Sequence, residues 1–292
     1  MNRIDLTFTY GRVFISAMKN DGLRNWFDQY VAGFTAKENA APDLVTNIRL
    51  KKDHSERVVK EILWIADQLN LDDDDRDLAA VMALFHDIGR FEQYARYRTF
   101  ADHQSENHAE LGVKILRHHG VLDCLPPDRA DLICRVITYH NRAELPENET
   151  GECLFYARLL RDADKLDIWR VLIDHYQRQD LDDNPAVELG LPDIPGMSDR
   201  VYDMVVNAKI VQARHMRNLN DFKLLQIGWV FDINFAPALQ QVRDRRYVES
   251  ICRTLPPSDR LTQIKQAVMA WFDKKLPAGR SHNGPEPTQA EP

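Results

Sequence analysis

The apolar residues of this chain recur at intervals of three and four positions, and strand-like alternation is scarce. This spacing predicts helices over most of the 292 residues, each turning one apolar face toward a core. Glycine is sparse, at 12 residues, and falls mostly where one helical pattern stops and the next starts. The sequence therefore predicts an all-α protein.

Ionisable side chains lie on the apolar faces of these predicted helices. His54 shares its face with Val58 and Ile62, and the doublet His86-Asp87 ends the next apolar run. Imidazole and carboxylate groups in such surroundings are costly unless something pairs with them. A divalent metal ion is a partner that suits both groups.

Three later positions repeat this signature, namely His108, His140 and Asp164. Asp162 and Asp167 flank Asp164 but fall off its apolar stripe, so only Asp164 is predicted to face inward. A single histidine on an apolar face is commonly a hydrogen-bonded core residue, and that alternative stands for each position taken alone. Their occurrence together in one chain predicts a metal-binding site.

The pattern divides the chain into four parts. We predict a pair of N-terminal helices within 1–41, a metal-binding helical core over 42–180, a further helical block over 181–276 and a disordered tail over 277–292. The tail is rich in proline, glycine and polar residues, a composition that favours disorder. The role of the block over 181–276 and the oligomeric state stay open at this stage.

Boundary signals within the core predict where individual helices begin and end. Gly89 is expected to stop the helix that carries His86, and Ser105 is expected to cap the helix that carries His108. Gly120 is expected to end that second helix, and Pro126-Pro127 to open the helix that leads to His140.

Composition narrows the class of partner. The formal net charge of −7 argues against extended binding to a nucleic-acid backbone, which needs clustered Lys and Arg. A small phosphorylated ligand needs only a local cationic pocket and is compatible with this charge. The four cysteines show no metal-ligating spacing, and neither a signal-peptide core nor a membrane-spanning stretch is evident. These features favour a cytoplasmic protein without a membrane contact.

The order His54, His86-Asp87, Asp164 resembles the H…HD…D pattern of the HD superfamily of metal-dependent phosphohydrolases. The run Asp-Ala-Asp-Lys-Leu-Asp around Asp164 is similar to the last motif of that family. The resemblance covers roughly residues 42–178. It implies an all-α HD-domain bundle, here with additional N- and C-terminal helices. It also implies that His54, His86, Asp87 and Asp164 are the core metal ligands.

His108 and His140 fall where two-metal members of the superfamily carry extra histidines. The resemblance implies that they either bind a second metal ion or contact the substrate phosphate. One or two divalent ions per chain are expected, with Mn, Fe, Co, Ni, Mg and Zn all compatible with nitrogen and oxygen ligands. Asn141 stands where a further histidine would be expected.

The function implied is a metal-dependent phosphohydrolase that acts on a nucleotide or related phosphate ester through a metal-activated water. The run His86-Asp87-Ile-Gly-Arg also resembles the HDIGK run of HD-GYP proteins, so a cyclic-dinucleotide phosphodiesterase is a further possibility, although the GYP motif is absent. A non-catalytic metal- or nucleotide-binding regulatory module is the alternative from a different class.

Two cations next to the proposed ligands are candidates for a catalytic role. Arg90 and Lys165 could neutralise charge on a phosphate, although each could equally be a solvated or structural charge. The aromatic cluster Phe91, Tyr94, Tyr97 and Phe100 could line a pocket for a nucleobase or could be part of the core. The sequence does not choose between these alternatives.

Overall fold

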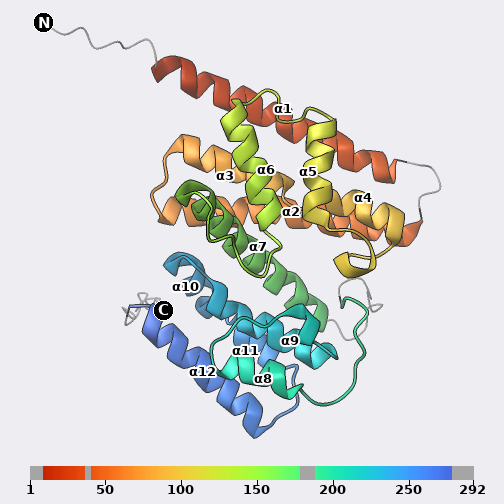
Figure 1. Cartoon of the computed structure of the whole chain (residues 1–292), viewed down its shortest axis with the longest axis vertical. Helices are drawn as coiled ribbons and strands as arrows, with labels where there is room; N and C mark the ends of the chain where they lie inside the picture. The colour runs from red at the N-terminus through yellow and green to blue at the C-terminus, as the bar shows by residue number, and fades with distance from the viewer. Residues whose placement is uncertain (1–8, 37–40, 178–187, 278–292) are drawn as a thin grey trace, which may run out of the picture.

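A computed structural model describes residues 9–36, 41–177 and 188–277, and these residues form helices and no strand (Figure 1). The predicted all-α class is confirmed. None of the helices in these ranges is both long and apolar enough to cross a membrane. Residues 278–292, most of the tail predicted to be disordered, lie outside the described part of the chain.

The first seven α-helices make up the larger part of the fold. They are α1 (Thr9–Thr35), α2 (Pro42–Gln68), α3 (Asp73–Phe85), α4 (Ile88–Tyr97), α5 (His108–His118), α6 (Pro127–Tyr139) and α7 (Gly151–Gln177), with the short 3-10 helix η1 (Asp102–Gln104) before α5. The single helix α1 stands where a pair was predicted. It contains no proline, and a glycine such as Gly22 weakens a helix without ending it.

The remaining helices gather around the C-terminal end of α7 in the lower half of Figure 1. They are α8 (Asp199–Val206), η2 (Ala213–His215), α9 (Leu219–Gly228), η3 (Trp229–Asp232), α10 (Ala236–Asp244), α11 (Tyr247–Cys252) and α12 (Asp259–Lys275). We call residues 189–276 the C-terminal block. Its buried apolar residues belong to the same continuous core as those of α1–α7.

Helix α7 joins the two groups. It packs against α2, α3 and α6 on one side and against α10 and α11 on the other. Trp169 of α7 is fully buried, donates from its indole Nε1 to the carbonyl of Gln226, 3.0 Å away, and lies against the rings of Trp229 and Tyr247. Because partners cover α7 on both sides, it has no solvent-facing stripe along much of its length.

The doublet His86-Asp87 occupies the short junction between α3 and α4. Gly89 was predicted to end a helix, but it lies in the first turn of α4. A Cβ atom at this position would lie 2.1 Å from the carbonyl oxygen of His108 and 2.7 Å from the amide nitrogen of Gly112. Glycine is therefore required here because the backbones of α4 and α5 are in direct contact.

We expect Gly89→Ala to destabilise the protein by about 2 kcal/mol, because the added methyl group meets backbone atoms that cannot rotate away. Urea unfolding followed by circular dichroism would measure the change. Gly22→Ala is the matched control, since a Cβ there meets nothing within 4 Å and alanine is the better helix former. Equal stability of the two variants would contradict the close contact between α4 and α5.

The predicted helix ends around α5 are partly correct. Gly120 follows the last turn of α5 with a φ of +58°, as expected of a residue that ends a helix. The N-cap is Asn107, whose Oδ1 accepts from the amides of Ala109 and Glu110, and not Ser105. Ser105 instead donates to the carbonyl of Ala101, because the chain turns through η1 before α5 begins.

Candidate metal centre

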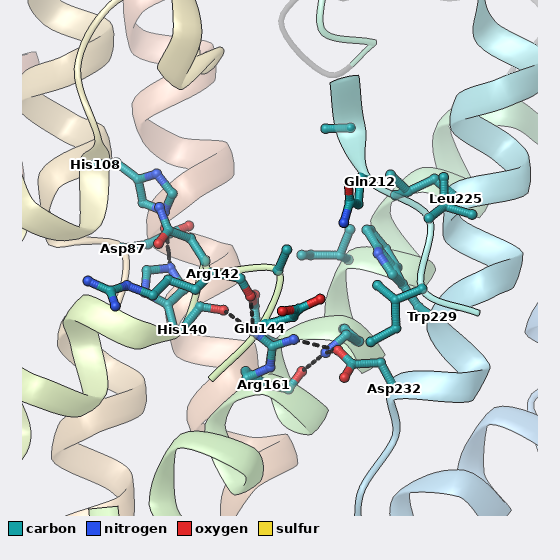
Figure 2. Close-up of a pocket in the computed structure, with 18 of the residues that line it drawn as sticks. Asp87, His108, His140, Arg142, Glu144, Arg161, Gln212, Leu225, Trp229 and Asp232 are labelled. Atoms are coloured by element: carbon teal, nitrogen blue, oxygen red, sulfur yellow. Dashed lines mark hydrogen bonds and ion pairs between the residues drawn. The ribbon is translucent and has the colours of Figure 1, made fainter. Parts of the chain in front are cut away.

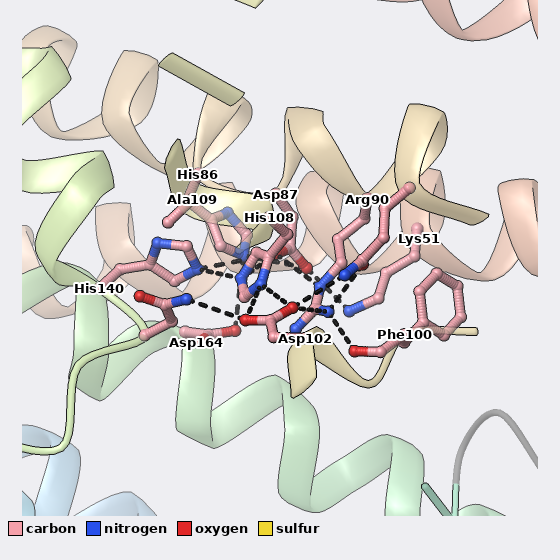
Figure 3. A network of polar contacts seen from close by, with 12 residues as sticks. Lys51, His86, Asp87, Arg90, Phe100, Asp102, His108, Ala109, His140 and Asp164 are labelled. Atoms are coloured by element: carbon pink, nitrogen blue, oxygen red, sulfur yellow. Dashed lines mark hydrogen bonds and ion pairs between the residues drawn. The ribbon is translucent and has the colours of Figure 1, made fainter. Parts of the chain in front are cut away.

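The structure brings the six candidate ligands together from five different helices or helix ends, and Figure 3 shows five of them, all but His54. His54 lies in the middle of α2 and Asp164 in the middle of α7, while the others lie at helix termini. His86 and Asp87 follow α3, His108 is the first residue of α5 and His140 is the C-cap of α6. Five of the six are buried, and Asp164 is partly exposed.

One cluster of donor atoms forms around His54. Its Nε2 lies 3.3 Å from Nε2 of His86 and 3.0 Å from Oδ1 of Asp164, which is 3.5 Å from Nε2 of His86. Oδ2 of Asp87 lies 3.5 Å and 3.6 Å from the same two nitrogens. Ligands about 2.1 Å from one metal ion are separated by roughly 3.0–3.4 Å, so these spacings are close to those of a coordination shell.

A second cluster forms around the other oxygen of Asp87. Nε2 of His108 lies 3.0 Å from Nε2 of His140, and these nitrogens lie 3.3 Å and 3.6 Å from Oδ1 of Asp87. Asp87 therefore presents one carboxylate oxygen to each cluster. An arrangement of this kind can hold two cations that share a bridging carboxylate.

The other ring nitrogen of each histidine faces a hydrogen-bond acceptor. Nδ1 of His86 and His140 donate to the backbone carbonyls of Ala83 and Ile137, at 2.7 Å and 2.6 Å. Nδ1 of His54 lies 2.7 Å from a carboxylate oxygen of Asp167, and Nδ1 of His108 lies 2.8 Å from one of Asp102. Because carbonyl and ionised carboxylate oxygens only accept, the proton of each neutral imidazole is on Nδ1.

This tautomer leaves a lone pair on every Nε2. The lone pairs of His54 and His86 then face each other, as do those of His108 and His140, and Oδ1 of Asp164 is buried without a hydrogen bond. Such an arrangement is unfavourable without positive charge between the atoms. The donor set consists of neutral nitrogens and carboxylate oxygens and therefore fits divalent metal ions.

The charges around the clusters keep the two carboxylates ionised. Burial alone would raise the pKa of Asp87, but the Lys51 ammonium, the neighbouring His86 and other partners hold it well below its usual range. Burial opposes ionisation of Asp164 in the same way, and the protons and positive charge that His54 and His86 carry in the absence of an ion lower the pKa of Asp164 well below the usual value. Burial, together with the charge of Arg90, lowers the pKa of His108 to about 3. The ionised carboxylates and neutral His108 are the protonation states that metal binding requires.

The prediction that only Asp164 faces inward from its part of α7 was wrong. Asp162 and Asp167 are more buried than Asp164. Asp167 accepts a hydrogen bond from His54 and one of 2.6 Å from Nε of Arg57. Burial alone would raise the pKa of Asp167, but these two contacts lower it to about 2. Asp162 accepts from the backbone of Asn234 in the C-terminal block. The periodicity argument failed because α7 is packed on two sides.

The candidate cations Arg90 and Lys165 both lie beside the clusters. Arg90 places Nε 3.5 Å from Oδ1 of Asp87 and donates to Asp102, which holds His108. Lys165 places Nζ 2.9 Å from Oδ2 of Asp232 and is buried. Both residues thus have structural partners as well as access to the pocket, and a catalytic role for either stays a prediction.

Sequence reasoning missed two residues that contact candidate ligands and a third that pairs with Lys165. Lys51 donates to Oδ2 of Asp87 at 2.8 Å, and Asp102 of η1 accepts a hydrogen bond from Nδ1 of His108. Asp232 of the C-terminal block pairs with Lys165 and lines the cavity beside the centre. Lys51 was detectable, since it lies one helical turn before His54. Asn141, where a further histidine was expected, donates to Asp102 at 3.2 Å.

A cavity of about 590 Å³ opens on these clusters. Figure 2 shows Asp87, His108 and His140 on one side of it and Gln212, Leu225 and Trp229 of the C-terminal block on the other. The block therefore forms a wall of the pocket.

We expect Asp167→Asn to weaken Mn²⁺ binding by about 10- to 100-fold, because the carboxylate that fixes the ring of His54 is lost while the volume is kept. Calorimetric titration of metal-free protein would measure the dissociation constant. Asp174→Asn is the control, since that residue also pairs with Arg170 but is absent from the hydrogen bonds of His54. An unchanged affinity of Asp167→Asn would contradict the role of this contact.

Residues 52–169 match the family model described as HD domain. Comparisons with curated proteins and with solved structures gave no match. The matched range contains His54, the His86-Asp87 doublet and Asp164, and it also contains His108 and His140.

Proposed function

We propose that this chain is a metal-dependent phosphohydrolase that acts on a nucleotide or related phosphate ester. Residues 52–169 place it in the HD-domain superfamily, whose members are generally metal-dependent hydrolases. The observation that carries this proposal is the convergence of four imidazole Nε2 atoms on the two oxygens of Asp87 and on Asp164. Such a donor set, open to a large pocket, is suited to catalysis more than to a closed structural site.

The residues would divide into two groups of ligands. His54, His86 and Asp164 would hold one divalent ion, His108 and His140 a second, and Asp87 would bridge them. When bound, such ions supply a Lewis acid and an activated water for attack on phosphorus. The remaining residues orient these ligands: Asp167 and Asp102 fix the rings of His54 and His108.

Cationic side chains of the pocket support a phosphorylated substrate. Lys51 and Arg90 lie next to Asp87 on the wall of the cavity, and Arg142 and Arg214 are exposed at its edge. Donors of this kind bind phosphoryl oxygens and stabilise the charge that they gain in the transition state. Lys165 lies deeper in the same wall, paired with Asp232.

Phosphate release from a panel of phosphate esters, with Mn²⁺ added, would test the proposal. We expect turnover by the wild type and none by Asp164→Asn. Metal binding without turnover of any ester would favour the regulatory module over the enzyme.

The number of ions can be measured separately. If two bind, His108→Ala should lower the metal content from about two per chain to about one, because its Nε2 belongs to the second cluster alone. Elemental analysis of the purified protein would measure the ratio. A wild-type content of about one, unchanged in His108→Ala, would contradict the two-ion arrangement and leave His108 and His140 as phosphate contacts.

A further inference from the structure

A second, smaller cavity of about 240 Å³ lies beside the metal centre. Most of its wall is apolar, and the apolar residues include Leu50 of α2, Phe100 after α4, Val171 and Leu172 of α7, and Phe222 of α9. A cavity of roughly 150 Å³ with such a lining is enough to hold a benzene ring. The space is therefore large enough for a compact apolar group.

This apolar cavity adjoins the larger one at the metal centre. His54 forms part of its wall, and Lys51, Arg90, Ile168 and Trp229 line both cavities. Lys51 places its Nζ 2.8 Å from Oδ2 of Asp87 and 5.3 Å from the centre of the Phe100 ring (Figure 3). A phosphoryl group held at the clusters would thus lie beside Lys51 and Arg90 and next to the apolar cavity.

The apolar cavity offers few partners for a polar group. Among its lining residues, Lys51, His54 and Arg90 belong to the metal centre, and the indole of Trp229 adds one donor. A nucleobase carries several donors and acceptors on its edge, and each of these left without a partner costs about 1–3 kcal/mol. A hydrocarbon or simple aryl group has no such cost and gains from burial.

We propose that this cavity binds the alcohol portion of the substrate, which narrows the phosphate esters proposed above to esters of a compact aryl or alkyl alcohol and removes nucleotides from them. This inference rests on the proposed function for the identity of the phosphate group. Of the predicted aromatic cluster, only Phe100 lines the cavity: Phe91 lies in the core and Tyr97 is exposed. The predicted base pocket is thus limited to a single ring of that cluster.

Phosphonates test this assignment without depending on turnover, since their carbon–phosphorus bond is not hydrolysed as an ester. We would titrate Mn²⁺-loaded protein with phenylphosphonate, methylphosphonate and a phosphonate analogue of adenosine 5′-monophosphate in a calorimeter. Phenylphosphonate is expected to bind at least tenfold more tightly than the other two, because only its ring fills the apolar cavity.

Two variants that each introduce a phenylalanine ring assign the binding to one cavity. Val171→Phe fills the apolar cavity, and Ile210→Phe places a ring in the larger cavity only; both positions are half-buried. The tenfold preference for phenylphosphonate over methylphosphonate should disappear in Val171→Phe and persist in Ile210→Phe. The reverse result would place the alcohol portion in the larger cavity and overturn the inference.

The remaining outcomes separate this inference from the proposed function. Equal binding of phenylphosphonate and methylphosphonate, or tighter binding of the nucleotide analogue, would overturn the apolar substrate even if esters are hydrolysed. Conversely, a tenfold preference for phenylphosphonate without hydrolysis of any ester would support the cavity assignment and refute the phosphohydrolase.

Discussion

The double variant His86→Ala/Asp87→Ala is expected to lose bound metal and to reduce turnover at least about 1000-fold. His86 contributes to the first cluster, and Asp87 supplies an oxygen to each, so both clusters lose a donor at once. Elemental analysis and calorimetric titration with Mn²⁺ would measure the metal, and release of phosphate would measure turnover. An unchanged metal content would mean that the ions bind elsewhere.

A second His-Asp pair provides the control. Asp174 and His175 lie near the end of α7, where His175 contacts Glu188 at 3.1 Å. The variant Asp174→Ala/His175→Ala removes the same two residue types without touching either cluster. It should keep its metal and activity, and circular dichroism should show that both double variants are folded.

The second large effect is expected from Asp232→Ala, which should lower the free energy of unfolding by about 3 kcal/mol. Asp232 pairs with two buried cations, Arg161 and Lys165, and the variant leaves both without this carboxylate. Burial and the charge of Arg161 lower the pKa of Lys165, and Asp232 opposes them. Urea unfolding at neutral pH would measure the loss.

An exposed ion pair in the same block serves as the control. Asp199 pairs with Arg260, and its side chain is 81% exposed. Because solvent screens such pairs, Asp199→Ala should cost less than about 1 kcal/mol. Similar losses in Asp232→Ala and Asp199→Ala would show that the buried pairs contribute no more than a surface contact.

Sequence periodicity placed residues well on helices that have one solvent-facing side. His54 on α2 and His108 on α5 are buried as expected, because the stripe of such a helix faces the core. The same reasoning misplaced Asp162 and Asp167, because α7 is covered on two sides. Periodicity locates the buried face of a helix only where the opposite face of that helix is exposed to solvent.

The supporting contacts of the site were beyond the reach of local sequence patterns. Asp102 lies in the three-residue 3-10 helix η1, which is too short to show an apolar stripe. Asp232 is 68 positions after Asp164 in the chain, so only the folded structure brings it to Lys165. The sequence predicted a helix end at Gly89. The close contact of its backbone with α5 could not be predicted, because the residues next to Gly89 in the sequence do not indicate which helix packs there.

The position of α7 between the two groups of helices has a thermodynamic consequence. The proposed ligand Asp164 belongs to a helix whose other side is buried by α10 and α11, so the C-terminal block cannot separate without exposing apolar parts of that helix. Any ion that binds the folded state alone adds RT ln(1 + [L]/Kd) to the stability of everything that unfolds with it. Metal binding at the proposed centre would thereby also stabilise the helices packed on the other side of α7, which contribute no ligand.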